Sequence, residues 1–137
     1  MKRTPMEVTV TELVQAAGLT DAFSAACEAG EPFHLSVENV PYMRLVVEVV
    51  AIGEVSVAHY YQQNGDAMRD PEIVFSTPRW LPVEITQDPL GSHRRADNGY
   101  YLSGAQELAR LWASNIRHQG FASRGTFTSA THQVKAA

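Results

Sequence analysis

Apolar and polar residues alternate with period two through the middle of the chain, as they do in strands with one buried face. Residues 33–38 alternate strictly, and residues 44–51 form a Val-rich run that is typical of a strand. From Val55 to Tyr61 the odd-numbered side chains share one face of a third strand. Residues 52–54 join the second and third strands tightly, so the pattern predicts an antiparallel hairpin.

Two further short strands are predicted after an Asn64-Gly65 turn, at residues 72–77 and 81–86. Pro78 lies between them and indicates a bend, because proline has no amide hydrogen for a sheet ladder. Residues 87–101 are polar, and we expect a loop or a ragged edge strand there. Together these segments predict an antiparallel meander.

Helical patterns lie on both sides of the predicted sheet. Thr9-Val10-Thr11-Glu12 fits a capping box, in which a hydroxyl and a carboxylate accept amide hydrogens at a helix start. We expect a helix through Ala17 and another from Thr20 to Gly30, as two short helices or one broken helix. Ser103-Gly104-Ala105-Gln106 has a similar pattern and predicts a helix at about 104 to 119. Its apolar stripe consists of Leu108, Leu111, Trp112 and Ile116.

The predicted fold class is α+β: an antiparallel meander sheet of four to six strands, covered by an N-terminal helical segment and a C-terminal helix. A length of 137 residues with 45% apolar content suits one domain, which we place at residues 1–122. Residues 123–137 are rich in Ser, Thr, Ala and Gly without periodicity, which predicts a flexible tail.

The charge is unevenly distributed along the chain. Residues 1–90 carry 5 Lys and Arg against 13 Asp and Glu, whereas residues 91–137 carry 6 against 2. We expect the two parts to attract each other. The chain lacks a signal-peptide pattern and any run of ~20 apolar residues, so we expect a cytoplasmic protein that does not bind membranes. Its single cysteine, Cys27, cannot form an internal disulfide.

The richest candidate for function is the polar segment around the Asn64-Gly65 turn. It combines carboxylates, an imidazole and a guanidinium within fourteen residues, from His59 to Glu72. We expect this loop, with nearby Asp88, to form a contact surface. The candidate binding residues are His59, Asn64, Asp66, Arg69, Asp70, Glu72 and Asp88.

The same residues allow two other interpretations. The carboxylates and Arg69 can simply hold a loop through amide bonds and a charge-assisted pair, and His59 can be a core histidine. Alternatively, His59, Asp66, Asp70 and Glu72 can ligate a divalent metal in an enzyme that acts on phosphate esters, although no known ligand spacing is present. The sequence contains no nucleophile elbow or glycine-rich phosphate loop, so we assign no catalytic residue and no cofactor.

The basic C-terminal region provides a third alternative. Arg94, Arg95, Arg110 and Arg117 can contact nucleic acid, or they can be a solvated helix face. An exposed sheet edge would also permit a homodimer as well as a monomer.

A resemblance to a known family is carried by four stretches, at residues 41–48, 57–72, 80–82 and 87–91. These stretches resemble the DUF6908-like family of small bacterial domains that are associated with phages or plasmids. The resemblance implies a family identity and no activity. We therefore expect a non-enzymatic binding or accessory protein of a mobile genetic element, with a protein as its partner.

Overall fold

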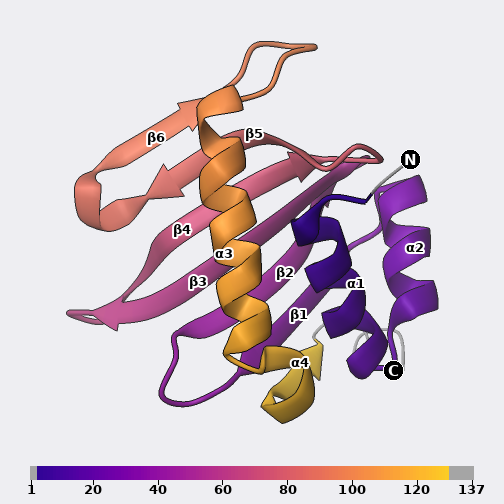
Figure 1. Cartoon of the computed structure of the whole chain (residues 1–137), viewed down its shortest axis with the longest axis vertical. Coiled ribbons are helices and arrows are strands. Elements are labelled where there is room, and N and C mark those ends of the chain that lie inside the picture. The colour runs from indigo at the N-terminus through magenta and orange to yellow at the C-terminus, as the bar shows by residue number, and fades with distance from the viewer. Residues whose placement is uncertain (1–2, 130–137) are drawn as a thin grey trace.

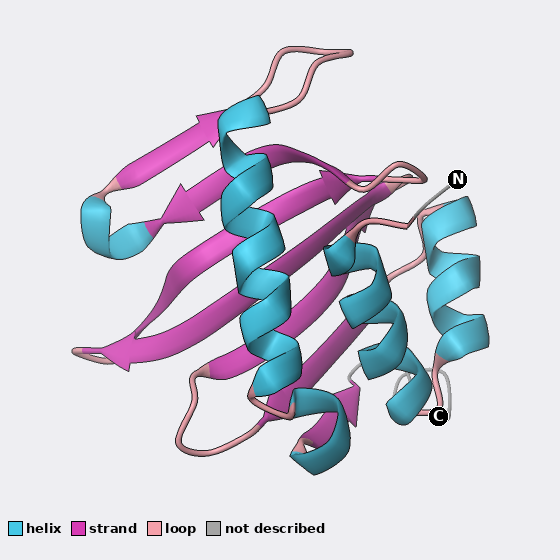
Figure 2. Cartoon of the chain, viewed as in Figure 1, coloured by secondary structure: helices cyan, strands magenta, loops and turns pink. Residues whose placement is uncertain are grey.

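The computed structural model describes residues 3–129, and it shows one antiparallel sheet with helices on one of its faces (Figures 1 and 2). The sheet has seven strands in the order β6-β5-β4-β3-β2-β1-β7. Six of them follow the chain order, and β7 returns from the C-terminal end to pair with β1. The strands are β1 (Phe33–Glu38), β2 (Arg44–Ala51), β3 (Glu54–Gln63), β4 (Asp66–Ser76), β5 (Leu81–Gln87), β6 (Ser92–Arg95) and β7 (Thr126–Ser129).

Two helices, α1 and α3, lie side by side across the sheet, and α2 lies beside α1 (Figure 1). The helices are α1 (Pro5–Ala16), α2 (Thr20–Ala29), α3 (Gln106–His118) and α4 (Phe121–Arg124), with short 3-10 turns η1 (Asp88–Leu90) and η2 (Ser103–Ala105). No described helix meets the length and hydropathy needed to cross a membrane. The α+β class that the sequence predicts is therefore confirmed.

The core lies between the helices and the face of the sheet that they cover. Strand register aligns the apolar positions in transverse rows, such as Leu35 opposite Val47 and Val47 opposite Val57. Each of these three side chains is completely buried. The helices contribute Val10, Leu13, Trp112 and Ile116 to the same cluster. This burial of apolar area is the main stabilising term of the fold.

The first helix begins one turn earlier than the capping box at Thr9 predicts. Thr4 is its N-cap and its hydroxyl accepts from the Glu7 amide at 3.2 Å, while Pro5 occupies the first turn, where no amide hydrogen is needed. Thr9 instead lies inside the helix and donates to the Pro5 carbonyl at 2.9 Å. The predicted break at Gly18 and the end at Gly30 are both present, with two separate helices.

The second predicted capping box is also wrong. Helix α3 begins at Gln106 without a side-chain cap, and the preceding residues form η2. Leu111 is 49% exposed, because Ala109 and Ala113 are the side chains that let α3 approach the sheet. Trp112 and Ile116 are buried as predicted.

The sheet is larger than the four to six strands predicted. Strand β4 starts directly after the hairpin turn rather than at Glu72. Residues 92–95, within the segment expected to be a loop or a ragged edge strand, form the edge strand β6. Residues 123–129, placed by prediction in a flexible tail, complete α4 and form β7 beside β1. The rest of the predicted tail, residues 130–137, lies outside the described residues. Both added strands have four residues, which is too short for a periodic pattern to show.

We predict that Gly125→Ala destabilises the protein. A Cβ atom at Gly125 would lie 2.4 Å from the Phe121 carbonyl oxygen and 2.4 Å from Cγ1 of Val37, so the connection between α4 and β7 would have to move. Overpacking of this kind costs about 1–3 kcal/mol in the free energy of unfolding. Gly104→Ala is the matched control, because its Cβ would meet nothing within 4 Å. Equal denaturant midpoints for the two variants would contradict the close packing at Gly125.

Candidate functional site

The face of the sheet opposite the helices is the candidate site, and we call it the open face. The described helices all lie on the other face of the sheet. The centre of the open face is nevertheless a floor of small side chains that are at most 5% exposed: Val46, Ser56, Ala58, Val74 and Thr86. Longer polar side chains surround this floor. They are Arg44, Glu48, Glu54, Tyr60, Arg69, Glu72, Glu84, His93 and Arg95, which the strand register places on the same side.

A network centred on Arg69 lies at one end of the open face. The guanidinium donates to both carboxylate oxygens of Asp88, at 3.0 and 3.2 Å, and to Glu72 at 3.1 Å. Asp88 also accepts from the Arg69 amide at 2.8 Å. Ser56 extends the network, since its hydroxyl donates to the other oxygen of Glu72 at 2.6 Å. The guanidinium and amide of Arg69 lower the pKa of Asp88, and Asp88 and Glu72 raise that of Arg69.

Local sequence places these groups on the same face. Asn64 and Gly65 both have positive φ, 53° and 86°, as a two-residue hairpin turn requires. The turn pairs β3 with β4, and a register shift between Ala58 and Tyr60 keeps Arg69 and Glu72 on the open face. Asp88 then reaches Arg69 from η1, just after β5. Three of the seven predicted binding residues, Arg69, Glu72 and Asp88, are thus brought together.

A second network lies beside it and was missed by the sequence analysis. Glu84 accepts from His93 Nε2 at 2.6 Å and from Arg95 at 2.8 Å, and Arg95 also donates to Glu54 at 2.8 Å. His93, and then Arg95, lower the pKa of Glu84. The pairing of Glu84 with Arg95 and of Thr86 with His93 across β5 and β6 creates this network. Only recognition of β6 as a strand would have predicted it.

Tyr60 of β3 and Arg44 of β2 lie opposite each other on the open face. The Arg44 guanidinium lies 5.6 Å from the centre of the Tyr60 ring, within the range of a cation-π contact. Partial burial, and then the nearby carboxylates of Glu72 and Glu48, raise the pKa of the Tyr60 hydroxyl. The phenol therefore stays neutral at physiological pH and remains a hydrogen-bond donor.

Carboxylates outnumber guanidiniums on the open face. In the described part of the chain, six acidic groups stand against three arginines on the face and its rim. The acidic groups are Glu38, Glu48, Glu54, Glu72, Glu84 and Asp88, and the basic groups are Arg44, Arg69 and Arg95. The surface therefore has a net negative charge when His34 and His93 are neutral, and it suits a positively charged ligand.

His59 lies on the covered face and is not part of these networks. It is 7% exposed, and its ring lies 5.5 Å from that of Trp112 and 5.6 Å from that of Phe121. Its Nδ1 lies 3.4 Å from the Arg44 carbonyl oxygen. Burial lowers the pKa of His59, and its contacts with the Arg44 and Met43 backbone and with Asp70 oppose this shift only in part. The core-histidine interpretation is the one that this geometry supports.

The remaining predicted site residues are scattered. Asn64 and Asp66 are exposed at the hairpin turn, and Asp70 lies opposite the register shift near His59. Glu72 faces away from His59, on the other side of the sheet. The four proposed metal ligands, His59, Asp66, Asp70 and Glu72, therefore do not assemble, and residues 3–129 contain no other cluster suited to a metal ion.

Three of the four arginines proposed to contact nucleic acid have carboxylate partners. Arg95 bonds to Glu54 and Glu84, and Arg117 bonds to Glu12 at 3.1 Å. Arg110 pairs with Glu107 on the same helix. Arg94 lies opposite Ile85 and faces away from Arg95 on the edge strand. These arginines consequently do not form one continuous basic surface.

Comparison with known protein families gives a match that covers most of the chain. The model of a family described as a domain of unknown function, DUF6908, matches residues 8–122, which include both networks of the open face. Searches of curated proteins and of solved structures return no match.

We predict that Asp88→Ala lowers the free energy of unfolding by about 1–2 kcal/mol. The substitution leaves the Arg69 amide without its acceptor and removes the two-oxygen partner of its guanidinium. Asp66→Ala is the matched control at the exposed turn, with an expected change within about 0.5 kcal/mol. Urea unfolding of both variants measures the difference. Similar midpoints would mean that the Arg69 network contributes nothing to stability.

We predict that neutral His59 makes stability sensitive to acid. Its pKa is lower in the folded state than the ordinary value of 6.5, so the unfolded chain binds the proton more readily. Its contribution is complete above that value and declines as pH falls towards the folded pKa, by at most about 1.4 kcal/mol per pH unit. Urea unfolding between pH 7 and pH 5 gives the free energy of unfolding as a function of pH. We expect this free energy to fall less steeply with decreasing pH in His59→Gln than in the wild type. His118→Gln, at an exposed site, should keep the wild-type slope; the opposite result would contradict the assignment.

Proposed function

We propose that this chain, which belongs to the DUF6908 family, is a non-enzymatic binding protein whose open face recognises a basic segment of a protein partner. The observation that carries the proposal is the excess of carboxylates on a sheet face that no described helix covers. A single-signed charge excess steers an oppositely charged partner and favours the correct orientation.

The two networks support binding because they hold their side chains in place. Arg69 and Arg95 each bridge two carboxylates, and each carboxylate group is fixed by at least one bond shorter than 3.2 Å. Side chains that are ordered before binding lose little conformational entropy when the partner docks. The open face is therefore a preorganised polar surface rather than a set of mobile charges.

Two tyrosines supply anchors at the rim. Tyr100 is 72% exposed and Tyr101 is 42% exposed, on the loop that follows β6. With Glu54, Arg95 and Asp97 they line a shallow pocket of about 200 Å³. Tyrosine and arginine are enriched among the residues that dominate interface energetics. A Lys or Arg side chain of the partner would find aromatic and carboxylate groups together here.

The same geometry favours binding over catalysis. The Ser56 hydroxyl lies 2.6 Å from a Glu72 oxygen, but Ser56 is 1% exposed, so a substrate cannot reach it. Glu72 is also paired with Arg69 at 3.1 Å. The acid and base groups of the two networks thus satisfy one another.

The proposal also covers the genetic origin of the protein and the compartment in which it acts. The sequence resemblance to phage- or plasmid-associated domains supports a role as an accessory protein of a mobile genetic element, acting in the cytoplasm. The two alternatives receive less support: the proposed metal ligands are split between two faces, and the four arginines proposed to contact nucleic acid do not form one continuous basic surface.

The proposal predicts binding of a short basic strand. We expect an alternating Lys-Thr dodecapeptide to shift the backbone amide resonances of β2 to β5, and an alternating Glu-Thr peptide to leave them unchanged. Glu48→Gln combined with Glu84→Gln should weaken binding about two- to thirtyfold, because each exposed ion pair contributes about 0.2–1 kcal/mol. Titration by NMR at two salt concentrations measures the affinity, which should fall at high salt.

The matched control removes the same charge from the helical side. Glu28→Gln combined with Glu107→Gln changes two exposed carboxylates away from the open face and should leave the affinity unaltered. Shifts confined to the helices, or equal weakening by both double variants, would show non-specific attraction and would refute the proposed surface.

A further inference from the structure

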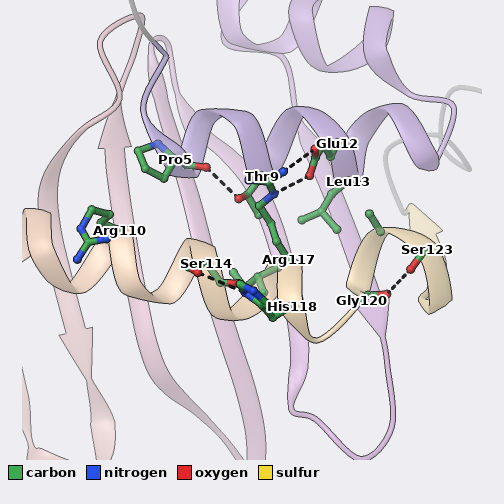
Figure 3. A pocket seen from close by; sticks show the side chains of 12 residues that line it. Pro5, Thr9, Glu12, Leu13, Arg110, Ser114, Arg117, His118, Gly120 and Ser123 are labelled. Carbon is green, nitrogen blue, oxygen red and sulfur yellow. Dashed lines mark hydrogen bonds and ion pairs between the residues drawn. The ribbon is translucent and has the colours of Figure 1, made fainter.

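A groove of about 550 Å³ runs between α1 and α3, on the side of the molecule opposite the open face (Figure 3). Each helix presents a row of polar side chains to the groove, and the side chains within a row are one or two helical turns apart. Helix α1 supplies Thr9 and Glu12, and α3 supplies Arg110, Ser114, Arg117 and His118. Parallel packing sets these stripes side by side, since Thr9 reaches the Ala113 carbonyl and Glu12 reaches Arg117.

The groove has an apolar part as well as a polar rim. Leu13 and Ile116 are each 1% exposed, so the apolar surface that a ligand can touch comes from Pro5 of α1 and Ala122 of α4. A ligand that carries both an apolar body and a charged group therefore fits this groove better than a bare ion.

The lining of the groove carries two arginines, Arg110 and Arg117, against one carboxylate, Glu12. Arg110 also pairs with Glu107, which lies outside the lining, so Arg117 is the cation that a ligand can take over. The Arg117–Glu12 pair is 3.1 Å long and its side chains are 51% and 43% exposed. Exposed pairs of this kind contribute little stability, so an anion can displace Glu12 from Arg117 at small cost.

Further donors lie within reach of Arg117. The Ser114 hydroxyl is 3.4 Å from His118 Nδ1, and the Ser123 hydroxyl is 3.4 Å from the Gly120 carbonyl, both long for hydrogen bonds. His118 Nδ1 lies 2.9 Å from the Ser114 carbonyl, to which it donates, and this leaves Nε2 for a ligand. In Figure 3, Ser114, Arg117 and His118 lie together in the middle of the groove, with Arg110 nearer the start of α3.

We propose that this groove binds a small phosphate monoester with an apolar or aromatic body. Arg117, released from Glu12, pairs with two phosphate oxygens, and Ser114 donates to the remaining one. His118 adds a donor through Nε2 when its ring carries both protons. A guanidinium matches the geometry of phosphate, and the extra donors favour three terminal oxygens over the two of a carboxylate. The apolar body of the ligand lies against Ala122. This site is separate from the open face and does not depend on the proposed protein partner.

Phenyl phosphate is the probe that tests the groove. Calorimetric titration should show that it binds more tightly than inorganic phosphate, which lacks the apolar body, and than phenol, which lacks the charge. In an NMR titration, phenyl phosphate should shift the backbone amides of residues 110–118, and this readout locates the ligand even if a substitution impairs folding.

Two substitutions should act in opposite directions. Arg117→Gln should weaken phenyl phosphate binding by about tenfold, since it removes a charge-assisted bidentate contact. Glu12→Gln should strengthen binding, because it removes the competing carboxylate and frees Arg117. Arg94→Gln makes the same charge change as Arg117→Gln at the far edge of the sheet and should leave the affinity unchanged.

Several results would overturn the proposal. They are the absence of phenyl phosphate binding at millimolar concentration, an affinity that Glu12→Gln does not raise, and equal effects of Arg94→Gln and Arg117→Gln. Tighter binding of a single-stranded decanucleotide than of phenyl phosphate, with loss in Arg117→Gln and a steep salt dependence, would assign the groove to nucleic acid instead.

Discussion

The continuous antiparallel register of the sheet is the constraint on which the rest of the structure depends. Because side chains alternate along every strand, a slip of one residue would exchange the covered face for the open face. The irregular pairing between β3 and β4 is tolerated because it falls between Ala58 and Tyr60, where it leaves His59 in the core and returns Arg69 to the open face. Apolar burial on one side therefore determines which polar groups meet on the other.

That constraint explains why a polar surface can be ordered without a layer above it. Small side chains occupy the central row, from Val46 through Ala58, and the longer ones beside them pair across strands. Ser56, Glu72 and Arg69 come from two adjacent strands, and Asp88 closes the network from the turn after β5. Each charge of the two networks is held by a neighbour of opposite sign, so this part of the surface is ordered before a partner binds.

The uneven charge along the chain becomes two chemically different sides of the molecule. Most of the sheet comes from the acidic first 90 residues, whereas α3 comes from the basic remainder. Among the described residues, the expected attraction between these parts takes the form of two groups of ion pairs, Arg117 with Glu12 and Arg95 with Glu54 and Glu84. The first lies in the groove between α1 and α3, and the second lies on the open face. One sequence asymmetry thus produces an acidic surface and a basic groove on opposite sides of the sheet.

The sequence by itself determined the local elements: the strands at residues 33–38 and 44–51, the Asn64-Gly65 hairpin turn, the two N-terminal helices and the α+β class. Period-two alternation indicates that one face of a strand is covered. It does not predict which residues of the neighbouring strands lie opposite its side chains. The alternation also put His59 on the face shared with Val55 and Val57, as a core histidine requires. Only the tertiary structure joined Arg69 to Asp88 nineteen positions away, paired β6 with β5 and formed β7 beside β1. These features depend on strand order and on contacts between distant segments, which a local pattern of hydrophobicity does not encode.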